Sequence, residues 1–214
     1  MSLQIFALLL KACGWTISIS AISIFLGLIL STVISAATLS SSRILSTAGN
    51  AFVSFFRGSP LLVQLLLIYN LLPAIGLDVP SIVAAIVGLT LCTAAYQAEN
   101  LRGGFLSVPK GLLEAAELLG MTHFQQFWRI KVPIALRVTL PALANEAILI
   151  LKASSLVSVV GVVELSRMAQ DLSASTFRPL PLFAMAALLY FLINSVVAFG
   201  AKYVERSFRW GIKT

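Results

Sequence analysis

Long apolar runs separated by short polar segments are the main pattern along this chain. Uncharged runs cover residues 15–37, 60–77, 81–98 and 181–201, and a fifth run with two charged residues covers 141–163. A helix that rises about 1.5 Å per residue needs about 20 residues to cross the roughly 30 Å apolar core of a bilayer. The pattern therefore predicts five membrane-spanning helices, the third of them reaching residue 101.

Proline and glycine mark the expected ends of these helices. The segment Arg57-Gly58-Ser59-Pro60 predicts a break in the chain, followed by a helix that Ser59 caps and Pro60 opens. Asp78-Val79-Pro80 predicts a tight turn outside the membrane, which would make the second and third spans antiparallel neighbours. Pro141 is expected to open the fourth span.

The composition indicates a membrane protein. Of the 214 residues, 59% are hydrophobic and only 11% are charged, whereas soluble domains carry about 25% charged residues. This excludes an ordinary water-soluble enzyme, and we expect one all-α integral membrane domain over residues 1–214. Two cysteines and one histidine are too few for a zinc or haem site, so we expect no metal and no bound cofactor. Cys13 and Cys92 are expected to be small buried apolar residues.

Basic residues predict the orientation of the chain. The net charge is +7, but the 15 Lys and Arg form no basic stripe of the kind that binds nucleic acid. With the N-terminus outside, 11 basic residues fall inside, 3 fall outside and Lys152 lies within the fourth span, in agreement with the positive-inside rule. The inside residues are Arg43, Arg57, Arg102, Lys110, Arg129, Lys131, Arg137, Lys202, Arg206, Arg209 and Lys213, and the outside residues are Lys11, Arg167 and Arg178. We therefore expect the N-terminus outside and the C-terminus in the cytoplasm.

The longest polar interruption, residues 102–140, is expected to be a cytoplasmic loop. Its centre has strong helix formers from Leu112 to Leu119, between Gly111 and Gly120. A helix of about two turns is not stable alone in water, so one with an apolar face needs a partner to dock into. The loop is therefore expected to meet a cytoplasmic partner.

Within this loop, Glu114-Ala115-Ala116 is followed after three residues by Gly120, after nine more by Ile130, and after one more by Val132-Pro133. This spacing resembles the EAA signature of the membrane-spanning permease subunits of ATP-binding-cassette (ABC) importers, in which Leu stands at the position of Val132. Other segments look like the polar-amino-acid branch of that family, which includes histidine, glutamine, arginine and cystine types. These segments are Arg57–Gln64, Ala95–Glu99, Arg102–Gly104 and Lys152–Leu156.

The resemblance implies a type I ABC importer permease with five transmembrane helices, located in the bacterial inner membrane with a periplasmic N-terminus. Residues 102–140 would hold a coupling helix that sits in a separate ATPase subunit. The chain has no GxxxxGK[ST] phosphate loop, so ATP and Mg²⁺ would be used by that partner and this chain would be non-catalytic. The implied assembly contains two ATPase subunits, a second permease chain, identical or homologous, and an external amino-acid-binding protein. Residues 164–178 are assigned to docking of that protein, with a plain connecting loop as the alternative.

Polar groups within the predicted spans are the candidates for a pathway for polar amino acids or amino-acid derivatives. Counted from Pro141, Lys152 lies about 16 Å along the fourth span, near the bilayer midplane. A lysine at that depth costs about 2.5–3.5 kcal/mol, so it needs a partner. That partner is either a substrate carboxylate or a group of the protein, such as Ser155, Asn145 or a carbonyl of another helix.

Glu99 and Arg102 are three residues apart and share one helix face. They form either a local ion pair or a functional site, in which Glu99 contacts a substrate amino group and Arg102 belongs to an inner gate. Arg57, Gly58 and Ser59 are either a structural helix start or an anion site at a helix N-terminus. Gln64, one turn deeper, would add a neutral hydrogen bond.

Two other classes of protein compete with the importer interpretation. A self-sufficient secondary transporter or channel would need internal repeats or a dense ion relay, and neither is visible in the sequence. A membrane scaffold would also display a loop helix, but it has no need for a polar group such as Lys152 at membrane depth.

Overall fold

The computed structural model describes residues 3–209, which form helices joined by short connections and contain no strand. Lys213, one of the basic residues assigned to the inside, lies outside the described residues. The elements are α1 (Leu3–Thr38), α2 (Arg43–Gly58), α3 (Leu61–Ala74), α4 (Ser81–Leu106), α5 (Lys110–Leu118), α6 (His123–Gln126), the π-helical turn η1 (Phe127–Lys131), α7 (Val132–Ala153), the 3₁₀ helix η2 (Ser154–Val160), α8 (Leu165–Thr176) and α9 (Pro179–Arg209).

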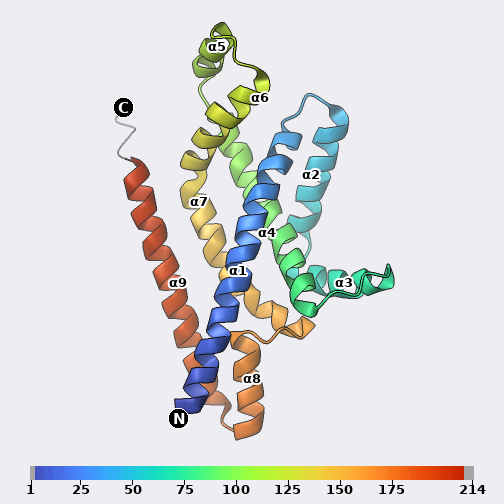
Figure 1. Ribbon diagram of the computed structural model, residues 1–214, viewed down its shortest axis with the longest axis vertical. Helices are drawn as coiled ribbons and strands as arrows, with labels where there is room; N and C mark the ends of the chain where they lie inside the picture. Colours follow the sequence, from blue (N-terminus) through green and yellow to red (C-terminus); the bar gives the residue numbers. More distant parts are fainter. Residues whose placement is uncertain (1–2, 210–214) are drawn as a thin grey trace.

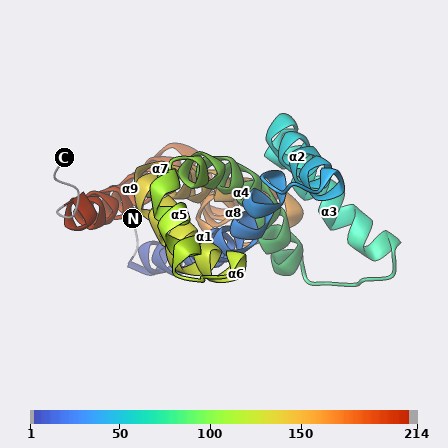
Figure 2. The ribbon, with the colours of Figure 1, turned by 90° about the horizontal axis from the view of Figure 1, so that it is seen from above.

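The long helices run up and down the same axis. From the N-terminus α1 leads to the far end of the molecule, α2 turns back, α4 leads up again, α7 returns and α9 leads up once more (Figure 1). The short helices α5 and α6 therefore lie at one end, and α8 lies at the opposite end beside the N-terminus (Figure 1). Viewed from above, α9 and α3 mark opposite sides of the molecule, with α1, α4 and α7 between them (Figure 2).

Four described helical segments are long and apolar enough to span a membrane: α1, α4, α9 and the continuous stretch His123–Val160 that contains α7. A fifth candidate is the pair α2 and α3, which meet at a bend of 110°. The all-α prediction is confirmed for the described residues, and the predicted five spans correspond to the count in which α2 and α3 together form one span.

The prediction of a second helix over residues 60–77 is wrong in its bounds. α3 covers only Leu61–Ala74, and it projects sideways from α2 (Figure 1). α3 still packs against α4 through Leu65, but the helix that runs antiparallel to α4 is α2 (Figure 1). The hydrophobic pattern missed α2 because Arg43 and Arg57 interrupt its apolar positions. Tertiary packing stabilises this amphipathic helix although its sequence is not that of an apolar span.

The prediction that Pro141 opens the fourth span is also wrong. α7 covers Val132–Ala153 and continues without a break from the π-helical turn η1, so Pro133 and Pro141 both lie inside a continuous helical stretch. Proline inside a transmembrane helix is tolerated because neighbouring groups satisfy the freed carbonyl. The depth of Lys152 in the membrane can therefore not be counted from Pro141.

The contact between α1 and α4 is the largest between any two helices of the described chain. Small residues make it possible: a Cβ added at Gly27 of α1 would lie only 2.3 Å from Cγ2 of Thr93 on α4. Membrane helices commonly associate through such small residues, because these allow close backbone approach. Cys13 on α1 and Cys92 on α4 are both free and buried, as predicted.

Candidate functional site

The predicted loop helix is present and lies beyond the ends of the long helices. α5 covers Lys110–Leu118, close to the expected Leu112–Leu119, and stands with α6 at the end of the molecule opposite α8 (Figure 1). Leu118 is 90% exposed and Leu119 is 81% exposed, so the apolar side of α5 is largely uncovered. Of the signature residues on this helix, Glu114 and Ala115 are exposed and Ala116 is buried. An apolar surface displayed in this way marks an interaction site.

Gly120 ends this helix by its backbone conformation. Its φ is +74°, a left-handed value that favours glycine. The Gly120 N–H donates to the Glu117 carbonyl at 2.9 Å, and the Met121 N–H donates to the Ala116 carbonyl at 3.0 Å. This pair of bonds is a Schellman motif, so the glycine of the signature is explained by the need to stop α5 and reverse the chain.

Residues after Gly120 connect α5 to the bundle. Thr122 and Gln125 form a capping box at the start of α6, which continues into the π-helical turn that contains Ile130. The Phe127 ring lies 5.4 Å from the Phe105 ring at the end of α4, centroid to centroid. The exposed helix is thereby attached to both α4 and α7, and a displacement of α5 would act on both.

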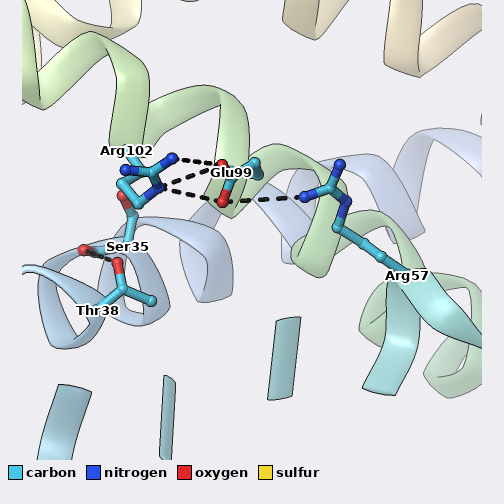
Figure 3. Close-up of polar contacts among 5 residues, drawn as sticks. All are labelled: Ser35, Thr38, Arg57, Glu99 and Arg102. Carbon is cyan, nitrogen blue, oxygen red and sulfur yellow. Dashed lines mark hydrogen bonds and ion pairs between the residues drawn. The ribbon is translucent and has the colours of Figure 1, made fainter. Parts of the chain in front are cut away.

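A cluster of three charged side chains lies between α2 and α4. The Arg102 guanidinium donates to both carboxylate oxygens of Glu99, the shortest contact being 2.6 Å from Nη2 to Oε1 (Figure 3). On the other side of Glu99, Arg57 Nη1 lies 3.9 Å from Oε2, and the Arg57 guanidinium stands over the Tyr96 ring at 5.5 Å. The local Glu99–Arg102 ion pair, one of the two alternatives, is present in the structure, and the partly exposed cluster carries one net positive charge.

The break between α2 and α3 differs from the predicted helix start. Ser59 does not cap α3: it ends α2, and its hydroxyl donates to the Phe55 carbonyl at 2.8 Å. Gly58 is the last residue of α2 and is therefore not unwound. Gln64 is 2% exposed, and its Nε2 donates to the carbonyls of Phe56 and Ser59 at 2.8 and 2.9 Å. The Gln64 amide thus satisfies the end of α2.

Lys152 and Ser155 lie elsewhere, in a groove between α7 and α9. Two adjoining cavities of about 360 and 500 Å³ share Lys152, Ala187 and Tyr190 as lining residues. Ser155 lines the first cavity, and its hydroxyl donates to the Lys152 backbone carbonyl at 2.9 Å. The Lys152 ammonium has no hydrogen bond or ion pair within residues 3–209, so neither Ser155 nor Asn145 is its partner there.

Comparison with known proteins decides the family. A family described as the binding-protein-dependent transport system inner membrane component matches residues 23–210. The chain belongs to this family. It is an ABC importer permease, and the recognition based on the loop spacing is confirmed.

The permease resembles characterised transport proteins over most of its length. It is 38% identical over 207 residues to the nopaline transport system permease protein NocM of Agrobacterium fabrum, which covers 92% of this chain and 86% of the relative. It is 36% identical over 193 residues to the L-cystine transport system permease protein TcyB of Bacillus subtilis, covering 90% and 82%.

Solved structures agree with this assignment. The permease matches an amino acid ABC transporter crystallised with histidines at a TM-score of 0.85 and 31% identity, covering 97% of this chain and 100% of that chain. It also matches the inward-facing MetNI methionine ABC transporter at a TM-score of 0.81 and 23% identity, covering 97% and 99%. The second match shows the fold alone, which is that of type I importer permeases.

The structure of the permease separates the predicted pathway residues into two groups. Arg57, Glu99 and Arg102 meet at the α2–α4 cluster, whereas Lys152 and Ser155 lie at the α7–α9 groove. Sequence reasoning missed residues of α9 that line the same groove. They are Tyr190, Asn194 and Ser195, and the four-residue spacing of the first two on an otherwise apolar helix is the pattern that would have indicated them.

Proposed function

We propose that this permease forms the translocation pathway of an ATP-driven importer for polar amino acids or amino-acid derivatives. The relatives that cover most of the chain are named for nopaline and cystine transport, and both compounds carry carboxylate and ammonium groups. The charged α2–α4 cluster and the Lys152 groove offer both signs of charge for such a zwitterion. The secondary-transporter and scaffold interpretations are not favoured by any observation.

The exposed helix α5 is the observation that supports coupling to a separate ATPase. It has nine residues, too few for a stable isolated helix, and its last residue, Leu118, is 90% exposed. In the proposal a cleft of the ATPase covers this surface and contacts the signature residues. Those residues are Glu114, Ala115, Ala116, Gly120, Ile130 and Pro133. ATP and Mg²⁺ bind to the partner, and closure of two ATPase subunits pushes two coupling helices together.

The proposed orientation places α5 in the cytoplasm. α8 and the N-terminus lie at the opposite end of the molecule, which supports a periplasmic N-terminus and a cytoplasmic C-terminus (Figure 1). The membrane would be the bacterial cytoplasmic membrane, in keeping with the inner-membrane family description. An amino-acid-binding protein would dock on the side of α8, within residues 164–178.

A second permease chain completes the proposed pathway. α9 is the least buried of the four single-helix candidates, and four or five spans are too few to enclose a polar passage. A copy of this chain, or a homologous one, would supply the facing half around a two-fold axis.

Pathway roles are proposed residue by residue. Lys152, with Ser155 beside it, contacts the substrate carboxylate, since its ammonium has no partner among the described residues. Arg102 belongs to the inner gate, and Glu99 meets a substrate amino group when Arg102, which holds both of its oxygens in this structure, moves away.

Near the break, Arg57 alone favours an anion, because Gly58 and Ser59 end α2 and the Ser59 N–H already donates to the Phe55 carbonyl. Gln64, which is buried behind the break, supports that backbone instead of meeting substrate.

Substitution of Leu118 tests the coupling role. Burial of a leucine side chain contributes about 1.5–3 kcal/mol, so Leu118→Ser should weaken binding of the cognate ATPase roughly 10- to 100-fold. Leu180→Ser is the matched control, because Leu180 is 82% exposed at the opposite end of the molecule. Equal ATPase affinity of the two variants would contradict docking on α5. Glu114→Lys should likewise abolish ligand-stimulated ATP hydrolysis.

The pathway itself is tested by uptake into proteoliposomes that contain the permease, its ATPase and its binding protein. Lys152→Met should lower amino-acid uptake while leaving ATPase binding unchanged, and Lys202→Met, on the exposed face of α9, is the matched control. Normal uptake kinetics for Lys152→Met would assign Lys152 a structural role. If the intact transporter moves no amino acid in the presence of ATP, the proposed substrate class is wrong.

A further inference from the structure

Glu164 is a carboxylate that is completely buried at the start of α8. Its exposed fraction is 0%, and none of the ion pairs found among the described residues includes it. Its Oε1 accepts a hydrogen bond from the Arg167 backbone N–H at 2.8 Å, and its Oε2 accepts one from the Ser166 backbone N–H at 2.9 Å. A buried charge is tolerated only where such donors surround it.

Two further contacts to Glu164 come from helices that are distant in sequence. The Tyr190 hydroxyl on α9 donates to Oε2 at 2.7 Å, and Thr16 Oγ1 on α1 lies 3.5 Å from the same oxygen. Thr16 also accepts a hydrogen bond from the Leu165 backbone N–H at 3.1 Å. Short residues such as Ser or Asp are sufficient to cap a helix. The longer glutamate here connects α8 to both α1 and α9.

Tyr190 has a second role, because its ring lines the groove that contains Lys152. Both cavities of this groove, about 360 and 500 Å³, have Lys152 and Tyr190 among their lining residues. The Tyr190 oxygen also lies 3.1 Å from Ser166 Oγ. Contacts to Glu164 and Ser166 therefore fix the end of the ring, and the first turn of α8 determines where this wall of the groove stands.

We propose that Glu164 and Tyr190 are positioning residues of the translocation pathway: the anchored ring sets the width of the Lys152 groove and thereby the affinity for the amino acid that occupies it. This inference rests on the proposed function, in which Lys152 contacts the substrate. A ring that is ordered before the substrate arrives lowers the entropic cost of binding. The same contact links α8, the element proposed to face the binding protein, to the groove.

Uptake kinetics in proteoliposomes provide the first test. Tyr190→Phe keeps the ring and removes only its anchoring hydroxyl, and loss of one hydrogen bond should raise KM for amino-acid uptake about three- to tenfold with a much smaller change in maximal rate. Tyr69→Phe is the matched control, because Tyr69 on α3 has no hydrogen bond among the described residues. Its KM should equal that of the unchanged protein. An equal KM for Tyr190→Phe would overturn the proposal.

The double variant separates positioning from a general loss of stability. If Glu164 acts on uptake through Tyr190, Glu164→Gln should raise KM by itself but add little in the Tyr190→Phe background. Independent, additive effects on KM would mean that Glu164 only stabilises the fold. If Glu164→Gln does not fold, Thr16→Val replaces it in this comparison of single and double variants. Thr16→Val removes a weaker contact to the same Glu164 oxygen.

A measurement on the purified permease tests the groove without requiring transport. Cys13 and Cys92 are buried, so a thiol introduced as Lys152→Cys would be the accessible site for a maleimide. Release of the ring by Tyr190→Phe should change the labelling rate of this thiol several-fold, while Tyr69→Phe should not. An unchanged rate would overturn the positioning role even if the transporter carries amino acids. A changed rate without any uptake would leave the positioning role standing and refute the substrate class.

Discussion

Gly27 packs so closely against α4 that adding one methyl group tests the main helix contact of the fold. A Cβ at residue 27 would lie 2.3 Å from Thr93 Cγ2 and 3.4 Å from the Ala94 backbone nitrogen. Thr93 is β-branched and restricted in χ1, so it has little room to turn away, and the helices must separate. Overpacking of this kind costs about 1–3 kcal/mol. For a protein of this size, Gly27→Ala should lower Tm by roughly 2–12 °C.

A thiol-reactive dye can follow this unfolding, because the buried free thiols Cys13 and Cys92 become reactive only when the bundle opens. Gly14→Ala is the matched control: it lies on the same helix with no atom within 4 Å of its added Cβ, so Tm should not fall. Thr93→Ser removes the clashing methyl group and should restore Tm in the Gly27→Ala background. If Gly27→Ala melts like the unchanged protein, or if Thr93→Ser gives no recovery, the packing argument is wrong.

Three further substitutions address the candidate site. Gly120→Ala places a side chain at a φ of +74°, which costs about 1–2 kcal/mol and frays α5, so ligand-stimulated ATP hydrolysis should fall. Gly111→Ala, in α5 at a residue without a positive φ, should leave ATP hydrolysis unchanged. An equal loss of hydrolysis in the Gly111→Ala and Gly120→Ala variants would refute the role of the helix end. Glu99→Gln should change the free energy of unfolding by less than about 1 kcal/mol, because the ion pairs of Glu99 are partly exposed. The same variant should change amino-acid uptake several-fold, and unaltered uptake would show that the cluster is not part of the pathway. Gln64→Leu leaves two carbonyls at the end of α2 without their donor and should cost about 1–3 kcal/mol in a dye-monitored melt, so an unchanged Tm would contradict the capping role.

Hydrophobic periodicity was sufficient to predict the long apolar helices, because lipid requires continuous apolar surface. It failed at α2, where Arg43 and Arg57 interrupt the pattern and packing against α1 and α4 decides the structure. It failed again at Pro141, since the effect of a proline inside a membrane helix depends on neighbouring helices that the local sequence does not reveal. The helix ends were therefore less predictable than the helices.

The candidate site was predictable where residues are close in sequence. Glu99 and Arg102 share a helix turn, so their ion pair follows from spacing alone. The contact between Glu164 and Tyr190 spans 26 residues and two helices, and no periodicity indicates it. Gln64 was expected to add a hydrogen bond in the pathway and not to cap a helix, because the carbonyls that it satisfies became visible only with the bend between α2 and α3.

The pairing of α1 with α4 also has a consequence for biosynthesis. Gly27 and Thr93 are 66 positions apart, and at about 5–20 residues per second the ribosome reaches α4 roughly 3–13 s after α1. During that interval the hydroxyl groups along α1 have no partner helix. Thr16, Ser31 and Thr32 each donate to a carbonyl of their own helix, three or four residues earlier. The nascent helix thus carries its own acceptors and can enter the bilayer before the helix that later covers it has been synthesised.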